Sequence, residues 1–573
     1  MRRVGRVQVM IWSVVAAWGC GSDQGPTPLP SCSAAQTPQV SLAAGGYTSI
    51  DATTGSGCAT FPANASTVNP AEYLVVAQAA TSITDTSAAF VLNSATPTAA
   101  RVAAQRVTAP SPARATTAAA FDHYMRQLGR RHLGAMAPAS GRLPAAPAAA
   151  AVGPAATPPA VGSQRTFVVC GSLTSCSPFK SVTATAKAVG LHVAIYVDNA
   201  APQPGLSASD LDTLKQVFDT LLYPLATTTF GAVTDLDNNG VVIALMTPVV
   251  NSLVPAPCTL GYLAGFFFPD DLVLSVPTSA SNHGEIFYSI VADPLGNLSC
   301  PHSAANVKQV TPGVFVHEFQ HMINFAQHFV IHPGSSIPGS SEEGWLDEGQ
   351  SKYAEELTAR RYQSAGDTTT YQQYLDGNDL YDASQYLAGT GTASLLIGQD
   401  QGTLAEIGAS WLFVRYIMDQ YGGAVNAYGG AALAGKLDQT VLTGATNVQT
   451  QSGQTFTTLL ERWALTNWVS DLPNFTAPTE LQYTSWHFRA TFDTLYMRYH
   501  VKNPGRFPPY YPLVPDSAAG SQVSLSGVLH AGSGVYVRAL QAPSGAAFTL
   551  QLSGPGVLLP TYIGPRYQVI RIR

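Results

Sequence analysis

Two histidines and a glutamate in the stretch TPGVFVHEFQHMINFAQHF, residues 311–329, have a spacing that suits metal chemistry. His317 and His321 are four residues apart, so on a helix they lie one turn apart and can both reach a single ion. Glu318 is rotated by about 100° from His317, which places its carboxylate beside a metal-activated water rather than on the metal. The pattern is typical of two zinc ligands and a general base.

The residues around this triplet predict a buried helix. Thr311 offers a capping hydroxyl and Pro312 suits the first helical position, so we expect the helix to start there. Apolar residues would bury most of its surface, namely Val314, Phe315, Phe319, Met322, Ile323 and Ala326.

A catalytic zinc ion needs a third protein ligand, because three protein ligands leave one open position for water. The stretch SSEEGWLDEGQSKYAEEL, residues 340–357, predicts a second helix that begins near Ser341 or Gly344. Glu348 falls in its first turns, where the helix dipole favours a carboxylate.

The sequence Trp-Leu-Asp-Glu-Gly at 345–349, together with His-Glu-x-x-His at 317–321, resembles the gluzincin metallopeptidases. The resemblance covers about residues 165–470 and is greatest to exported neutral zinc metallopeptidases of the hyicolysin type. It implies that His317, His321 and Glu348 hold one zinc ion and that Glu318 is the catalytic base. It also implies a zincin-like domain, in which a mixed β-sheet lies over the active-site helix and a helical subdomain follows.

The chain departs from the related thermolysin-like pattern at one supporting position. Those enzymes carry an aspartate four residues after the ligand glutamate, where it orients the first histidine, and this chain has Lys352 there. Asp347 or Glu355 could orient a histidine instead, although either could equally be an ordinary solvated helix carboxylate.

In these families a second electrophile usually stabilises the oxyanion of the transition state beside zinc, and the candidates here are Tyr381, Tyr386 and Tyr416. The spacing selects none of the three, and each alone could be a packing residue.

Composition excludes one class of partner. Charged residues make up 11% of the 573 residues and the formal net charge is −6. No basic patch is available for phosphates, so we do not expect nucleic acid to bind. The length exceeds one ordinary hydrophobic core and predicts several domains.

The first twenty residues predict export. Arg2, Arg3 and Arg6 precede an apolar run, Val7–Trp18, that is too short to span a membrane. Cys20 follows this run, and the segment resembles a bacterial lipoprotein signal. The resemblance implies a lipid on Cys20 and attachment to the membrane at the cell envelope. Ordinary signal-peptide cleavage, with secretion, is the alternative.

The remaining six cysteines fit an oxidising compartment. Proximity in sequence suggests the pairs Cys32–Cys58, Cys170–Cys176 and Cys258–Cys300. Other connectivities of the six cysteines stay open.

The whole chain predicts an α+β protein whose catalytic domain is flanked by small all-β modules. Residues 271–276 and 285–293 read as strands of the catalytic sheet, and the second could be the edge strand that aligns an extended peptide. We divide the chain into a signal peptide at 1–20, an N-terminal β-sandwich-like module at 21–110, a short helix and Ala/Pro-rich linker at 111–164, the metallopeptidase domain at 165–517 and a C-terminal β module at 518–573.

One further motif concerns calcium. Asp235, Asp237, Asn239 and Gly240 match the first half of a calcium-binding loop, but the twelfth position holds Met246 instead of a glutamate. A tight polar turn is the preferred interpretation, and calcium is the alternative.

These observations predict an exported zinc metallopeptidase that hydrolyses peptide or protein substrates, as an endopeptidase, with Glu318 as the base. An aminopeptidase-like gluzincin is one alternative, and it would need an acidic anchor for the substrate's free amine. A non-catalytic surface-binding lipoprotein that retains the fold is another. Absence of zinc from the purified protein would favour the binding protein.

Overall fold

The computed structural model describes residues 31–32, 37–54, 56–95, 105–106, 121, 125, 128, 157–255, 261–331, 341–398 and 402–573. The predicted signal peptide with Cys20, most of the Ala/Pro-rich linker, and Cys258 lie outside the described residues. Helices and strands are mixed throughout the described part, as predicted for an α+β protein.

Two five-stranded sheets form a β-sandwich from both ends of the chain. The first has the strand order β1-β16-β3-β14-β12 and the second has the order β2-β15-β4-β13-β5. The strands are β1 (Tyr47–Asp51), β2 (Cys58–Phe61), β3 (Ala71–Ala79), β4 (Ser87–Ser94), β5 (Gln105–Arg106), β12 (Asp516–Ala519), β13 (Ser524–His530), β14 (Gly534–Gln541), β15 (Phe548–Ser553) and β16 (Pro565–Arg571).

Each sheet contains strands from residues 47–94 and from residues 516–571, so the two predicted β modules share one core. Every residue of β3 is buried, and both neighbours of β3 in its sheet, β14 and β16, come from the C-terminal segment. Phe61 of β2 stacks on Phe548 of β15 with 4.4 Å between ring centroids. Local strand patterns predicted the strands but could not show this pairing, which joins residues more than 400 positions apart.

A six-stranded mixed sheet lies in the predicted catalytic region. Its order is β10-β11-β9-β8-β7-β6, in which β8, β9 and β11 are parallel and the other pairs are antiparallel. The strands are β6 (Gln164–Val169), β7 (Lys180–Val189), β8 (Val193–Asp198), β9 (Val242–Met246), β10 (Gly265–Phe267) and β11 (Ile286–Ser289).

Two predictions about this sheet are wrong. The segment 285–293 supplies β11, which lies inside the sheet, and the edge strand is β10. The segment 271–276 is not a strand, because a 3-10 helix, η2 (Pro269–Leu272), begins at a proline and turns the chain there. The buried Asp271 side chain holds this turn by accepting from the backbone N–H of Asn282 at 2.6 Å and the hydroxyl of Tyr288 at 2.5 Å.

Helix α5 (Ala304–Phe325) carries the His-Glu-x-x-His triplet and packs against β10 and β11. It begins eight residues earlier than predicted, because Ser303 caps it by accepting from the backbone N–H of Asn306. Pro312 therefore lies inside the helix. Thr311 donates its hydroxyl to the carbonyl of Val307 at 2.6 Å and does not cap the helix. The other helices of this region are α2 (Ala208–Val217), η1 (Phe218–Leu222), α3 (Tyr223–Thr229), α4 (Pro248–Leu253) and η3 (Ala326–Ile331).

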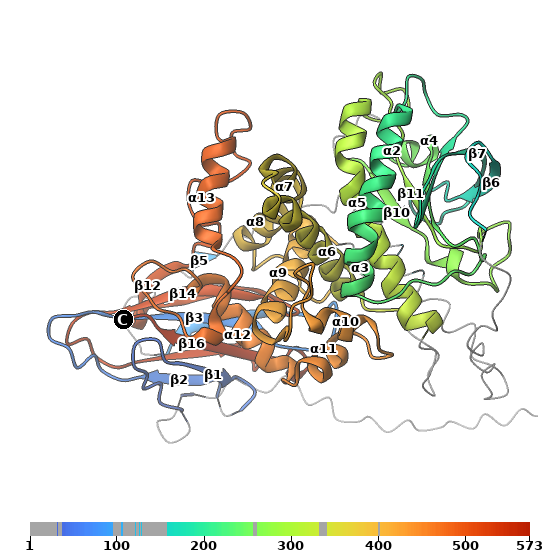
Figure 1. The fold of residues 1–573 in the computed structure, drawn as a ribbon. Coiled ribbons are helices and arrows are strands. Elements are labelled where there is room, and N and C mark those ends of the chain that lie inside the picture. Colours follow the sequence, from blue (N-terminus) through green and yellow to red (C-terminus); the bar gives the residue numbers. More distant parts are fainter. Residues whose placement is uncertain are drawn as a thin grey trace, which may run out of the picture.

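A helical region follows and lies between the two β structures (Figure 1). The second predicted helix is confirmed as α6, which begins at Gly344, one of the two predicted starts. Helix α12 contacts the sandwich through β3 and β16. The elements are α6 (Gly344–Ser364), α7 (Thr368–Tyr374), η4 (Leu375–Asp379), α8 (Leu380–Ala388), α9 (Leu404–Tyr421), α10 (Ala432–Asp438), α11 (Gly444–Ser452), α12 (Phe456–Val469) and α13 (Phe488–Tyr499), with the short turns η5 (Thr479–Leu481), η6 (Gly520–Gln522) and η7 (Thr561–Ile563).

Two predicted disulfides are confirmed, Cys32–Cys58 and Cys170–Cys176. The third predicted pair includes Cys258 and so falls partly outside the described residues. Within the residues that are described, none of the helices has the length and apolar character needed to cross a membrane.

Candidate metal centre

Helices α5 and α6 bring the three predicted metal ligands together. His317 and His321 lie on α5 and Glu348 lies in the second turn of α6, and all three are buried. The Nε2 atoms of the two histidines are 3.1 Å apart. One Glu348 oxygen lies 3.6 Å from His317 Nε2, and the other lies 3.6 Å from His321 Nε2.

This spacing suits a small tetrahedral ion. Zinc binds nitrogen and oxygen ligands at about 2.0–2.1 Å, so tetrahedral ligands lie about 3.3 Å from one another. The two Nε2 atoms lie at a comparable separation, and each has a Glu348 oxygen at 3.6 Å. Two imidazoles, which can be neutral, and a carboxylate are a donor set that zinc takes. The residues therefore fit a bound metal ion, and the group could hold one.

A carboxylate from α6 contacts the far nitrogen of each histidine. Glu355 Oε1 lies 2.7 Å from His317 Nδ1, and Asp347 Oδ1 lies 2.9 Å from His321 Nδ1. These are the two residues that the sequence offered as alternatives, and each contacts a different histidine. Because both Nδ1 atoms have acceptors, both Nε2 atoms point to the shared space beside Glu348.

Lys352 takes part in this support, although it stands where thermolysin-like enzymes have an aspartate. Its ammonium lies 3.2 Å from Glu355, 3.4 Å from Asp379 and 3.8 Å from Asp382. Burial opposes the charge of Lys352, but these three carboxylates outweigh it and raise the pKa well above its usual range. Burial likewise opposes the charge of Glu355, and Lys352 and His317 outweigh that, so the pKa of Glu355 is lowered and it stays an anion.

The electrostatics of His317 favour a charged imidazole in the metal-free protein. Burial lowers its pKa, but the hydrogen bond to Glu355 and the charges of Glu318, Glu355 and Glu348 raise the pKa to about 9. A metal ion must displace that proton, so binding and protonation compete at His317.

Glu318 is fixed by the edge strand of the sheet. Its Oε2 accepts a hydrogen bond from the backbone N–H of Phe267 in β10 at 2.8 Å. Glu318 lines the same cleft as His317 and Glu348, which has a volume of about 610 Å³. The carboxylate therefore lies beside the ligand group and is not part of it.

The structure separates the three tyrosines that the sequence offered as oxyanion partners. Tyr381 lines the cleft. Tyr386 does not, because its hydroxyl bonds to Ser533 and its ring stacks on a tryptophan of α12. Tyr416 is also remote, since its hydroxyl donates to the carbonyl of Glu480 at 3.0 Å. Of the three candidates, Tyr381 is therefore the one that the structure places in the cleft wall.

Sequence reasoning missed other residues of the cleft. Asn378, at a kink inside η4, donates to Glu355 Oε2 at 2.9 Å. Arg506, in the loop after α13, lines the cleft although it is 188 residues from Glu318 in the chain. Neither belongs to a motif with a spacing relative to the zinc triplet, so no local signal could have identified them.

Amide side chains join α5 and α6 behind the ligands. Asp438 of α10 is fully buried and accepts hydrogen bonds from Gln320 and Asn324 of α5 and from Gln350 of α6. Burial raises the pKa of Asp438 well above its ordinary value. These hydrogen bonds to Asp438 join α5 and α6 on the side that lies behind the metal ligands.

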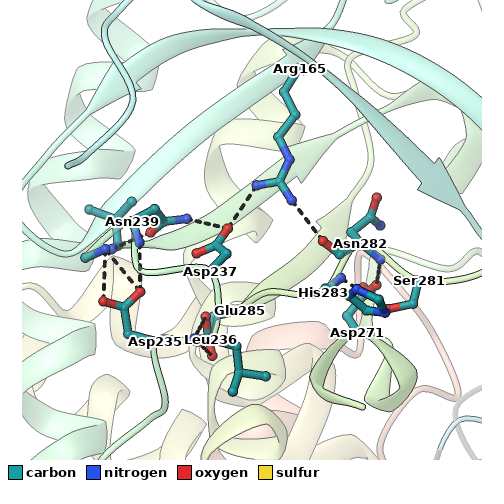
Figure 2. Close-up of polar contacts among 12 residues, drawn as sticks. Arg165, Asp235, Leu236, Asp237, Asn239, Asp271, Ser281, Asn282, His283 and Glu285 are labelled. Carbon is teal, nitrogen blue, oxygen red and sulfur yellow. Dashed lines mark hydrogen bonds and ion pairs between the residues drawn. The ribbon is translucent and has the colours of Figure 1, made fainter. Parts of the chain in front are cut away.

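The loop with partial calcium-loop character forms a tight turn (Figure 2). Asp235 accepts from the backbone N–H groups of Asn239 and Gly240, and Asp237 pairs with Arg165 at 3.0 Å. Glu285, which precedes β11, brings a third carboxylate within 4.8 Å of those of Asp235 and Asp237. The three carboxylates could share a cation, and Glu285 reaches them from outside the loop that the sequence pattern covered.

Comparison of the chain with models of known protein families and with curated proteins finds no match in either set.

Proposed function

We propose that the protein is a zinc metallopeptidase that hydrolyses peptide bonds in peptide or protein substrates. The observation that carries the proposal is the arrangement of His317, His321 and Glu348, in which each histidine has its own carboxylate partner and Nε2 faces the third ligand. Zinc bound there would activate a water molecule and polarise the scissile carbonyl.

Glu318 supplies the proton transfers. Its carboxylate lies beside the ligand group and is oriented by the N–H of Phe267, so it can take the proton of the attacking water and pass it to the leaving amine. Glu355 and Asp347 hold the two imidazoles in the tautomer with the proton on Nδ1. The unpaired side of β10 offers backbone groups to an extended peptide that enters the cleft.

Export is part of the proposal. The disulfides Cys32–Cys58 and Cys170–Cys176 are typical of proteins outside the cytoplasm. We propose a bacterial cell-envelope protein with a lipid on Cys20, or a secreted protein if signal cleavage occurs without lipidation.

Casein hydrolysis by the chain without residues 1–20 tests the activity. The sandwich needs strands from both ends of the chain, so the test protein must keep residues 47–94. We expect cleavage by the parent, loss on chelation and recovery with zinc. Glu318→Gln should keep its zinc and lose turnover, while Asp493→Asn, an exposed carboxylate on α13, should keep both. A zinc-loaded parent without activity, or equal activity in Glu318→Gln, would refute the proposal.

A further inference from the structure

Arg506 is a cation in the cleft wall that has no acceptor among the described residues. Its Nε is buried without a hydrogen-bond partner, and its guanidinium forms no ion pair with a described carboxylate. Two arginines on the neighbouring helices are paired with carboxylates: Arg415 contacts Glu356 and Arg498 contacts Asp376. A buried donor without an acceptor is costly, so such groups in native proteins call for a partner.

The surroundings of Arg506 hold the guanidinium in place without using its donors. It lies over the ring of Tyr381 with 4.7 Å to the centroid and over that of Tyr499 with 5.7 Å. Phe507 is buried next to it and packs edge-on against Tyr381. Gly377 leaves open the space next to the guanidinium, since a Cβ there would lie 3.5 Å from an Nη atom. Cation–π contacts of this kind fix the plane of the guanidinium group and leave its N–H groups free to bind a ligand.

Arg506 differs in its ion pairing from the other basic residue that lines the cleft. Lys352 is the other lysine or arginine that lines it, and three carboxylates within 3.8 Å already surround that ammonium. Asp382 also lines the cleft, and Arg506 lies close enough to lower its pKa, but the two form no ion pair. Arg506 is therefore the cleft cation with capacity for a further anion.

We propose that Arg506 is a specificity-determining residue that binds a carboxylate of the substrate, either the C-terminal carboxylate of a peptide or an Asp or Glu side chain. The inference rests on the proposed peptidase function and adds a preference among its substrates. The planar fork of arginine suits a carboxylate, which accepts two parallel N–H bonds. A substrate carboxylate in the cleft would give the guanidinium the charged acceptor that it lacks among the described residues.

A binding experiment that needs no turnover tests this proposal. Zinc-loaded Glu318→Gln chain, immobilised, is offered acetylated hexapeptides randomised over Ala, Phe, Leu, Ser, Gln and Arg. One pool has a free C-terminal carboxylate, a second has a C-terminal amide, and a third has the amide and one internal Glu. We expect the first or third pool to be retained about 10- to 100-fold better than the second, the range for a charge-assisted hydrogen bond. Which of the two is retained identifies the source of the carboxylate.

Adding Arg506→Gln should abolish the preference, and Arg506→Lys should keep part of it, because a lysine has the charge without the fork. Lys502→Gln is the matched control, since it removes a positive charge from an exposed position in the same loop. Equal retention of all three pools, or a preference that survives Arg506→Gln in a folded variant, would overturn the proposal about Arg506 alone. No retention of any pool, together with no casein cleavage by the parent, would instead overturn the peptidase function and this inference with it.

Discussion

Glu355 Oε1 lies 2.7 Å from His317 Nδ1, and Glu355 follows Glu348 by seven residues on α6. Seven residues are two helical turns, so both glutamates lie on one face of the helix. One face of α6 therefore carries both Glu348, the candidate ligand, and Glu355, which orients the candidate ligand His317. Any movement of α6 relative to α5 would change the position of both glutamates relative to the histidines.

The contact between Glu355 and His317 should determine metal affinity. We expect Glu355→Ala to weaken zinc binding about 10- to 100-fold, because His317 loses the acceptor that fixes its ring and tautomer. Asn378→Ala removes only the hydrogen bond to the other Glu355 oxygen and should have a smaller effect. Zinc affinity is measured by competition with a chelator of known affinity. Unchanged affinity in Glu355→Ala would show that the contact does not support the site.

Zinc affinity should rise with pH through the neutral range. The pKa of His317 is about 9 in the metal-free protein, so metal binding releases a proton from it below that pH. Each pH unit below about 9 should then change the apparent affinity by up to about tenfold from this group. The same competition experiment at pH 6, 7 and 8 checks the slope, and Glu355→Ala should flatten it.

The metal-free protein should lose stability as pH rises toward 9. The folded-state pKa of His317 is raised above its unfolded value, so its protonation stabilises the fold fully below about pH 6.5. This contribution disappears as pH rises through about 9. Urea unfolding of the chelated chain between pH 6 and 9 measures the change, and a zinc-loaded sample should lack it. If the unfolding free energy of the chelated chain rises with pH over this range, while that of the zinc-loaded chain does not, the predicted loss of stability is contradicted.

Gly349 should be sensitive to any added side chain. A Cβ at Gly349 would lie 2.7 Å from the carbonyl oxygen of Ser410 and 2.6 Å from Val414 on α9. Gly349→Ala should therefore push α6 from α9 and destabilise the fold by about 1–3 kcal/mol. Gly313→Ala on α5 is the matched control, because its Cβ would meet Tyr374 at an ordinary 3.7 Å and alanine favours a helix. Thermal unfolding of the two variants should shift in opposite directions or by clearly different amounts.

The N-terminal strands should not fold without the C-terminal ones. Deletion of residues 518–573 removes β13 to β16, and β3 then loses both of its neighbours. We expect limited proteolysis to degrade residues 37–95 in the shortened chain and to spare them in the full chain. A protease-resistant 37–95 segment in the shortened chain would show that this segment folds independently.

The grouping of the candidate metal ligands and part of the local structure were predictable from the sequence. Spacing along a helix is a local property, so His317, Glu318 and His321 could be interpreted from their neighbours alone. Helices α9 and α12 carry local signals as well, since Thr403 and Thr455 cap them through their side chains. The start of α5 was misjudged, since Ser303 caps the helix upstream and the helix continues through Pro312, a residue that usually begins one.

Only the tertiary structure decided which distant groups meet. The contacts of Glu355 with His317 and of Asp347 with His321 depend on how α6 packs on α5, and no spacing in the chain specifies that packing. The position of Arg506 in the cleft depends on the path of the loop after α13. The pairing of β3 with β14 and β16 joins the two ends of the chain. Such contacts depend on the burial of surfaces that are far apart in sequence, and a local pattern records that a face is apolar without recording what covers it.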